Sequence, residues 1–212
     1  MAIPSESEIR RALEQRHGRE MQDRFSSATV AVCGLGGLGS HIAAALARAG
    51  VGHLHLIDFD RVDLTNLHRQ QYFIPQLGMY KADALKATLE QIDPYLHIEA
   101  HTVRLTPDNL EELLSGADVI CEAFDGAEQK AMLVNGVLEH FPEKYLVSAS
   151  GMAGMDSAND IRTRRVMGRF YLCGDGRSEV ADCGSLVAAR VMVCAAHQAH
   201  MILRILSGKT DV

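Results

Sequence analysis

The charged and amide side chains between residues 58 and 81 have the composition of a polyphosphate-binding site. Asp58 ends an apolar run, Asn66, Arg69 and Gln70 follow it, and Lys81 comes shortly afterwards. Arginine can grip a phosphate with two parallel donors, and lysine can supply a mobile point charge. A hydride-transfer enzyme has no use for such a cluster directly after a ribose-binding carboxylate. The cluster therefore favours a nucleotide with several phosphates.

A glycine-rich turn, Cys-Gly-Leu-Gly-Gly-Leu-Gly at residues 33–39, precedes this cluster. It lies between an apolar run at 28–32 and a helical pattern that ends near Ala49. Glycines let the backbone approach phosphates, and the N-terminus of the following helix directs free N–H groups at them. Such a turn alone is weak evidence, because many dehydrogenases have one. The residues expected to form this part of the cofactor site are Gly34, Gly36, Gly37, Leu38 and Gly39.

Asp125 is a candidate magnesium ligand. It follows an apolar strand pattern at 117–122, and ligands bind at the carboxyl ends of such strands. A carboxylate among phosphate-binding cations suggests Mg²⁺, which prefers one or two carboxylates together with phosphate oxygens. The combined chemistry is adenylyl transfer, in which a carboxylate attacks the α-phosphorus and needs no general base because it is already ionised. An alternative is that Asp125 only caps the next helix.

The elements that must position these residues alternate between strand and helix patterns. This alternation predicts an α/β fold, a Rossmann-like, doubly wound, mostly parallel sheet covered on both faces. We expect an N-terminal helix and a small irregular or antiparallel C-terminal extension over the active site. The predicted helices are 5–24, 41–49, 76–92, 107–114, 127–140 and 185–206, and the predicted strands are 28–33, 53–58, 97–103, 117–122 and 145–149.

Length and composition predict one domain, residues 1–212, in an ordinary globular protein. It divides into an N-terminal helical segment (1–26), a nucleotide-binding core (27–150), and an extension with a C-terminal helix (151–212). Apolar residues make up 47% of the chain, charged residues 23%, and the net charge is −6. This balance argues against nucleic acid or a membrane as a partner. Residues 1–8 lack a signal-peptide pattern, and the cysteines lack a disulfide spacing, so we expect a cytoplasmic location.

The motifs together resemble the ThiF/MoeB/HesA family, which is related to ubiquitin-activating enzymes. The resemblance rests on Gly34-x-Gly36-Gly37-Leu38-Gly39, the sequence Ala-Gly-Val-Gly at 49–52, the segment 58–70, Lys81 and Asp125. It implies a homodimer that uses ATP and Mg²⁺ to adenylate the C-terminal glycine of a ubiquitin-like sulfur carrier. The form of residues 60–67 and the short chain are most similar to the thiamine-linked members, whose carrier is ThiS-like.

The resemblance also implies roles for single residues. Gly36 and Gly37 would meet the phosphates and Asp58 the ribose, within a motif that includes Asp60 and Gln70. Asn66, Arg69 and Lys81 would contact the triphosphate, and Asp125 would serve the Mg²⁺. An N-terminal arginine of the family reaches the partner subunit's ATP. Arg16 is the best candidate for it, with Arg10 and Arg11 as alternatives.

The cysteines depart from the pattern of the longer family members, which hold a structural zinc with two Cys-x-x-Cys pairs. Cys173 aligns with one ligand, but Phe170 stands three positions before it, so no structural zinc is expected. Cys183 fits a family cysteine ahead of the last helix, which implies a catalytic role in which it forms a persulfide, thioester or acyl-disulfide with the carrier. A helix N-terminus there would raise its thiolate fraction. The alternative is a small buried thiol without a catalytic role. Cys33, Cys121 and Cys194 are predicted core residues, and the histidines show no convincing ligand spacing.

Other functions remain open at this stage. The acceptor could be a different carrier, such as a MoaD-like protein, or a carboxylate attached to tRNA. From other classes, the glycine turn and Asp58 would also suit an NAD(P)-dependent oxidoreductase or a nucleotide-binding scaffold without turnover.

Overall fold

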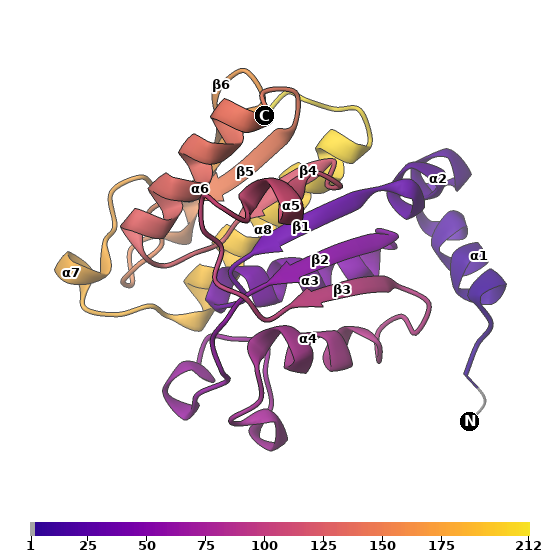
Figure 1. The fold of residues 1–212 in the computed structure, drawn as a ribbon, viewed down its shortest axis with the longest axis horizontal. Helices are drawn as coiled ribbons and strands as arrows, with labels where there is room; N and C mark the ends of the chain where they lie inside the picture. The colour runs from indigo at the N-terminus through magenta and orange to yellow at the C-terminus, as the bar shows by residue number, and fades with distance from the viewer. Residues whose placement is uncertain (1–2) are drawn as a thin grey trace.

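A seven-stranded sheet runs through the computed structural model, which describes residues 3–212 (Figure 1). The strand order is β3-β2-β1-β4-β5-β7-β6. All neighbouring pairs are parallel except β6–β7. The strands are β1 (Thr29–Cys33), β2 (His53–Ile57), β3 (His97–His101), β4 (Val119–Glu122), β5 (Tyr145–Ala149), β6 (Arg162–Met167) and β7 (Phe170–Gly174). The predicted α/β class and mostly parallel sheet are confirmed.

Helices cover both faces of the sheet. Helices α3, α4 and α8 pack on one face, and α5 and α6 on the other (Figure 1). The helices are α1 (Glu6–His17), α2 (Arg19–Ser27), α3 (Gly37–Ala49), α4 (Lys81–Leu89), α5 (Leu110–Leu114), α6 (Ala127–His140), α7 (Val180–Cys183) and α8 (Ala188–Leu206), with 3₁₀ turns η1 (Leu64–Asn66), η2 (Ile74–Gln76) and η3 (Ala158–Asp160).

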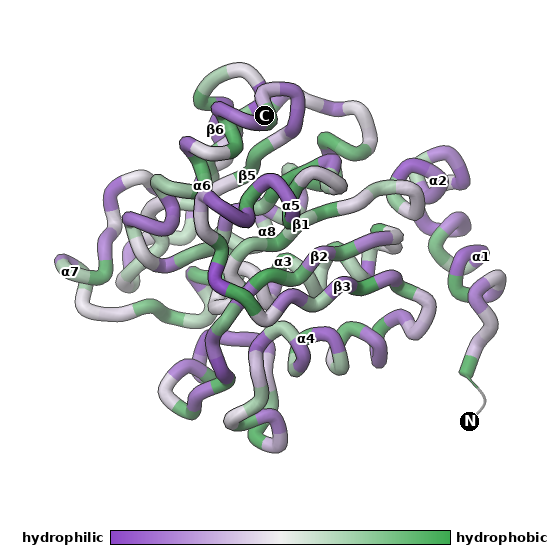
Figure 2. The backbone as a smooth tube through the Cα atoms, in the orientation of Figure 1, coloured by the Kyte–Doolittle hydropathy of each residue, from purple (hydrophilic) through white to green (hydrophobic). Residues whose placement is uncertain are grey.

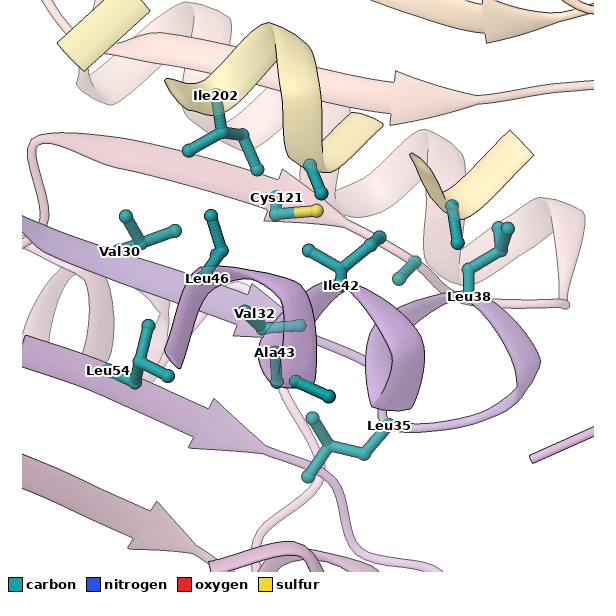
Figure 3. Close-up of a cluster of buried hydrophobic side chains, with 14 of the residues drawn as sticks. Val30, Val32, Leu35, Leu38, Ile42, Ala43, Leu46, Leu54, Cys121 and Ile202 are labelled. Carbon is teal, nitrogen blue, oxygen red and sulfur yellow. The ribbon is translucent and has the colours of Figure 1, made fainter. Parts of the chain in front are cut away.

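The larger part of the core lies between the sheet and helices α3 and α8. Val30 and Val32 of β1 belong to this part of the core, together with Ile42 and Leu46 of α3. Ile202 of α8 belongs to the same cluster (Figure 3). Figure 2 shows the matching hydropathy, with hydrophobic stretches along the central strands. The predicted core cysteines Cys33, Cys121 and Cys194 are all fully buried. The core therefore fixes α3 against β1, and with it the glycine turn that joins them.

The N-terminal helix prediction is wrong at one residue. Gly18 has φ of 89°, and it divides the expected single helix 5–24 into α1 and α2. A right-handed helix requires negative φ, so the chain turns there. The predicted segment 1–26 also includes Met1 and Ala2, which lie outside the described residues.

The C-terminal extension contains an antiparallel hairpin, as expected, but this hairpin does not lie over the active site. Its hairpin, β6–β7, joins the main sheet, because β7 pairs in parallel with β5. Strand β6 is the edge of the sheet and presents Arg162, Arg164 and Arg165. The predicted helix 76–92 is also shorter than expected, because α4 begins only at Lys81.

Among residues 3–212, no helix is both long enough and apolar enough to cross a bilayer.

Candidate active site

A pocket of about 250 Å³ lies at the carboxyl ends of β1, β2 and β4. The strand order reverses here, since β2 and β4 flank β1 on opposite sides, and such a switch point leaves a crevice for ligands. Most predicted site residues line it: Gly34, Gly36, Gly37, Leu38, Asp58, Asp60, Asn66, Arg69, Gln70, Lys81 and Asp125. The sheet therefore brings together residues that are far apart in the sequence.

The glycine turn places the N-terminus of α3 in the pocket. Gly36 is the N-cap of this helix, and its first-turn N–H groups are available to an anion. Gly34 has φ of 91°, and a Cβ there would lie 2.8 Å from the Ala123 carbonyl oxygen. Gly39 does not line the pocket, contrary to the prediction. A Cβ on Gly39 would lie 1.8 Å from the Gly34 carbonyl oxygen, so this glycine allows the helix to pack on the turn.

Asp58 is a buried carboxylate held by the backbone. Its Oδ2 accepts a hydrogen bond from the Leu35 N–H at 2.7 Å, and its Oδ1 accepts one from the Asp60 N–H at 2.7 Å. Burial raises the pKa of Asp58, although the nearby Lys81 and the two N–H groups oppose this rise. Each oxygen keeps a further lone pair. Asp58 can therefore accept hydrogen bonds from the hydroxyl groups of a ribose.

Lys81 is the first residue of α4, which starts later than predicted, and it is not a mobile charge. Its side chain is only 6% exposed, and its Nζ lies 2.8 Å from Oδ2 of Asp60. The Asp60 carboxylate itself is half exposed, so solvent still reaches the pair. The structure thus holds this ammonium group at a fixed point of the pocket wall.

Asn66, Arg69 and Gln70 come from the turn that begins with η1. Among residues 3–212, Arg69 forms no ion pair, and the buried Oε1 of Gln70 has no hydrogen-bond partner. The ring nitrogens of His68 lie 2.9 Å from the Thr65 carbonyl oxygen and 3.2 Å from that of Leu186. His68 thus connects this turn to the segment before α8, while Arg69 stays available to an anion.

Asp125 lies on the rim of the pocket, in the segment between β4 and α6. It is exposed, and it is not the cap of α6, because Gly126 occupies the N-cap position without a side-chain capping bond. The capping alternative is therefore wrong. A solvated carboxylate in the same pocket as the glycine turn has the donor chemistry that Mg²⁺ prefers.

A buried ion pair supports the strand end next to Asp125. The fully buried Glu122 accepts hydrogen bonds from Lys130 Nζ at 2.8 and 2.9 Å, and from the Phe124 N–H at 2.8 Å. The hydroxyl of Ser148 donates to the same carboxylate. With these partners, the charge of Glu122 is compensated, and the turn that carries Phe124 and Asp125 is fixed.

Two polar residues of the pocket were missed in the sequence. Arg104 follows β3, and its guanidinium lies 4.5 Å from the ring centroid of Phe59. Gln129 comes from the first turn of α6. Neither belongs to a contiguous motif, and only the placement of β3 beside β2 could have indicated Arg104. Val103, Leu105 and Phe124 supply apolar walls that suit a flat base.

Arg16 and Cys183 are not in this pocket. Arg16 is exposed on α1, which together with α2 lies at the amino end of β1, opposite the pocket (Figure 1). Arg10 pairs with Glu14 and Asp23. Arg11 is exposed and donates to the Ser7 carbonyl oxygen.

Cys183 is exposed and is the last residue of the short helix α7. It precedes α8 by several residues, so the expected helix N-terminus does not act on it. Cys173 is buried on β7, and its sulfur lies 3.4 Å from Oγ1 of Thr163.

A buried salt bridge between α8 and Asp175 helps to hold the segment after β5, which brings Met152 to the pocket. Arg190 of α8 and Asp175 are 4% and 1% exposed, and Nη2 lies 2.7 Å from Oδ2. Arg190 also donates to the Ala153 carbonyl oxygen, next to the pocket residue Met152. Burial by itself would raise the pKa of Asp175. Hydrogen bonds from Ser178, the Arg177 N–H and Arg190 outweigh burial and hold the pKa well below its usual value.

Comparison with solved structures supports the fold. The tRNA N6-threonylcarbamoyladenosine dehydratase TcdA of E. coli, solved in complex with ATP, superposes with a TM-score of 0.85 at 22% identity. The match covers 98% of both chains. E. coli MccB, solved with ATP, gives a TM-score of 0.70 at 21% identity over 89% of this chain and 58% of MccB. At these identities the likeness establishes a shared Rossmann-type fold.

Comparison with curated sequences is more specific. A sulfur carrier protein adenylyltransferase of Thermus thermophilus is 36% identical over 132 residues, 62% of this chain and 44% of the relative. A molybdopterin-synthase adenylyltransferase of Haemophilus influenzae is 37% identical over 113 residues, 53% of this chain and 46% of the relative. The matches thus span less than half of these relatives. The sequence model of the ThiF family matches residues 9–212, and this chain belongs to that family.

Proposed function

We propose that this protein binds ATP with Mg²⁺ and transfers AMP to a carboxylate. The observation that carries the proposal is the pocket itself. Arg69, Lys81, Asp58 and the glycines at the N-terminus of α3 all line it. This combination suits a nucleoside triphosphate, with cationic groups for its phosphates and a carboxylate for its ribose.

The chemistry follows from where these groups lie. The acceptor carboxylate attacks the α-phosphorus, the bond between this phosphorus and the bridging oxygen breaks, and pyrophosphate leaves with the electron pair. Arg69 and Lys81 stabilise the negative charge that develops on the leaving phosphates. The first-turn N–H groups of α3 orient the triphosphate, and Asp58 orients the ribose. No residue needs to act as a general base.

The exposed carboxylate of Asp125 fits a magnesium ion. It faces the same pocket as the phosphate-binding groups and is left to solvent. When bound, the ion would neutralise phosphate charge. Asp60 lines the pocket as well, but its carboxylate is already paired with Lys81. Asp125 is therefore the ligand that we propose.

The acceptor that we propose is the C-terminal glycine of a ubiquitin-like sulfur carrier, ThiS-like, in sulfur supply for thiamine. The similarity to the sulfur carrier protein adenylyltransferase of Thermus supports a sulfur carrier, and a MoaD-like carrier is the nearest alternative. We also propose that the protein acts as a homodimer. In this proposal, Arg16 reaches the partner's ATP. The Cys183 thiolate attacks the acyl-adenylate carbonyl of the activated carrier, so that a thioester forms and AMP leaves.

A carboxylate attached to tRNA is a second candidate acceptor. The match to TcdA, a tRNA-modifying protein, covers 98% of both chains, whereas the curated carrier-activating relatives are matched over less than half of their length. Against it stands the net charge of −6, since tRNA binding relies on basic surfaces.

Pyrophosphate exchange tests the function directly. Purified protein is incubated with ATP, Mg²⁺, labelled pyrophosphate and each candidate acceptor from the host. We expect acceptor-dependent exchange, with a mass increase of one AMP on the carrier. Replacing Arg69 by alanine removes one charge-stabilising group from the transition state. Exchange should therefore fall by about 100-fold or more, while Arg48→Ala, exposed on α3 outside the pocket, retains it.

Thermal-shift measurements separate the remaining alternatives. Stabilisation by ATP and Mg²⁺ but not by NAD(P) is the expected result. Stabilisation by NAD(P) alone would establish a dinucleotide site and exclude the proposal. A nucleotide-binding scaffold would bind ATP, yet show no exchange with any carrier or tRNA.

A further inference from the structure

Three polar side chains come together on the β2–β3 edge of the sheet, away from the nucleotide pocket. Residues alternate along both strands, so His55 of β2 and Glu99 and His101 of β3 share one face. The parallel register pairs His55 with Glu99 and places His101 beside Ile57. The cluster could not be recognised from sequence spacing, because it depends on the pairing of two distant segments.

The distances within this group are slightly longer than those between the ligands of one metal ion. Nε2 of His55 lies 3.8 Å from Oε2 of Glu99, and Nε2 of His101 lies 3.6 Å from the same oxygen. The three ligand atoms all lie within 4.8 Å of one another. Ligand atoms around a tetrahedral zinc ion are roughly 3.3–3.5 Å apart, given bonds of about 2.0–2.2 Å. Small side-chain shifts would therefore bring all three to one ion.

The surroundings of the two imidazole rings suit coordination. Nδ1 of His55 lies 3.5 Å from the Leu113 carbonyl oxygen of α5, to which only an N–H can donate, and this leaves the Nε2 lone pair facing Glu99. Nε2 of His101 is buried and has no hydrogen-bond partner among residues 3–212. A buried polar atom without a partner is costly, and a bound cation would satisfy it.

We propose that His55, Glu99 and His101 form a binding site for a divalent transition metal, with zinc as the best match. Two imidazoles and one carboxylate are a ligand set that zinc uses, with water in the fourth position, whereas Mg²⁺ prefers oxygen ligands alone. Glu99 is half exposed, so an ion can enter from solvent. The site is separate from the proposed magnesium site at Asp125 and does not depend on the adenylation proposal.

Such an ion would clamp the outermost strand to its neighbour. The His101 carbonyl oxygen also accepts a hydrogen bond from the Asp58 N–H, at 3.2 Å. Metal binding at the His101 side chain would therefore stiffen the strand end that positions Asp58 in the nucleotide pocket.

Calorimetric titration with Zn²⁺ tests the proposal. Untagged full-length protein is stripped with chelator, dialysed, and titrated without nucleotide. We expect saturable binding of one equivalent and, with Co²⁺, visible bands typical of tetrahedral coordination. His55→Ala and His101→Ala should each weaken binding at least about tenfold, and so should Glu99→Gln, whose half-exposed position makes it safe for folding.

Two controls make the result decisive. His140→Ala removes an exposed histidine at the end of α6 and should bind Zn²⁺ like the wild type. Cys183→Ser removes the exposed thiol and should also leave binding intact. Melting curves of the metal-free variants confirm their folding. An absence of saturable binding overturns the proposal, as does binding that survives all three ligand substitutions or is lost in Cys183→Ser.

Discussion

Lys81 lines the pocket and forms an ion pair with Asp60, and this contact determines how a substitution of Lys81 affects stability and activity. Without nucleotide, Asp60 compensates the buried ammonium group. In the proposed complex, the phosphates would compete for the same charge. The Asp60 carboxylate is half exposed and can be solvated alone, and the buried Asp58 keeps its two backbone hydrogen bonds, so loss of Lys81 leaves neither acid without partners.

Lys81→Met should therefore reduce adenylation without unfolding the protein. The methionine keeps the apolar stem but removes the charge that stabilises the leaving phosphates, so we expect kcat for pyrophosphate exchange to fall by about 100-fold or more. The matched control is Lys86→Met on the same helix, which lies outside the pocket and should retain exchange. Equal activity of the two variants would remove Lys81 from the mechanism.

At the scale of elements, the Asp175–Arg190 pair joins α8 to the loop that follows β7. Both side chains are almost fully buried, so replacing Asp175 by asparagine leaves a guanidinium without a counter-ion. Breaking a buried pair in this way costs about 3–5 kcal/mol. Asp175→Asn should lower the free energy of unfolding by this amount at pH 7 in urea titrations. Asp160→Asn, which breaks a solvent-exposed pair with Arg177, should cost less than about 1 kcal/mol.

The same pair gives a pH dependence with a defined sign. The folded state holds the pKa of Asp175 well below its usual value of about 3.9. The contribution of this carboxylate to stability is therefore complete above pH 4 and decreases as the pH falls towards the folded-state pKa. The stability difference between wild type and Asp175→Asn should shrink between pH 4 and pH 2. A constant difference over this range would contradict the assigned pair.

The elements also show what could be predicted from the sequence. The glycine turn, Asp58, Arg69 and Lys81 could be placed because their motif is nearly contiguous and a parallel sheet brings strand ends to one edge. The break at Gly18 depends on a positive φ that a helical pattern does not reveal.

Tertiary contacts account for the remaining differences between the sequence predictions and the structure. The position of Arg104 in the pocket depends on the strand order. The rigidity of Lys81 depends on its pairing with Asp60. The surroundings of Cys183 depend on a short helix, α7, that composition did not indicate.

For the whole molecule, the position of Arg16 gives a test of the proposed dimer. Arg16 lies at the opposite end of β1 from the pocket of its own chain, so any catalytic role requires a second subunit (Figure 1). Arg16→Ala and Arg69→Ala should each be inactive alone. When equal amounts of the two variants are mixed and their subunits redistribute, about half of the dimers are hybrids. Each hybrid has one complete site out of two, so about a quarter of the wild-type pyrophosphate exchange should return.

Arg11→Ala serves as the comparison for this mixing experiment, since Arg11 is also exposed on α1. If Arg11→Ala alone abolishes exchange and Arg16→Ala does not, the role belongs to Arg11. No recovery in the mixture, despite mass-spectrometric proof of hybrid dimers, would contradict action across the subunits.

The arginines of β6 have a consequence for the behaviour of the protein at high concentration. An outermost strand offers unpaired backbone groups to which a foreign strand could add, and this is how ordered aggregates begin to grow. Three guanidinium groups on one short strand make such an addition repulsive between identical molecules. Replacing them with neutral side chains would remove this protection against fibril formation, with no change inside the nucleotide pocket.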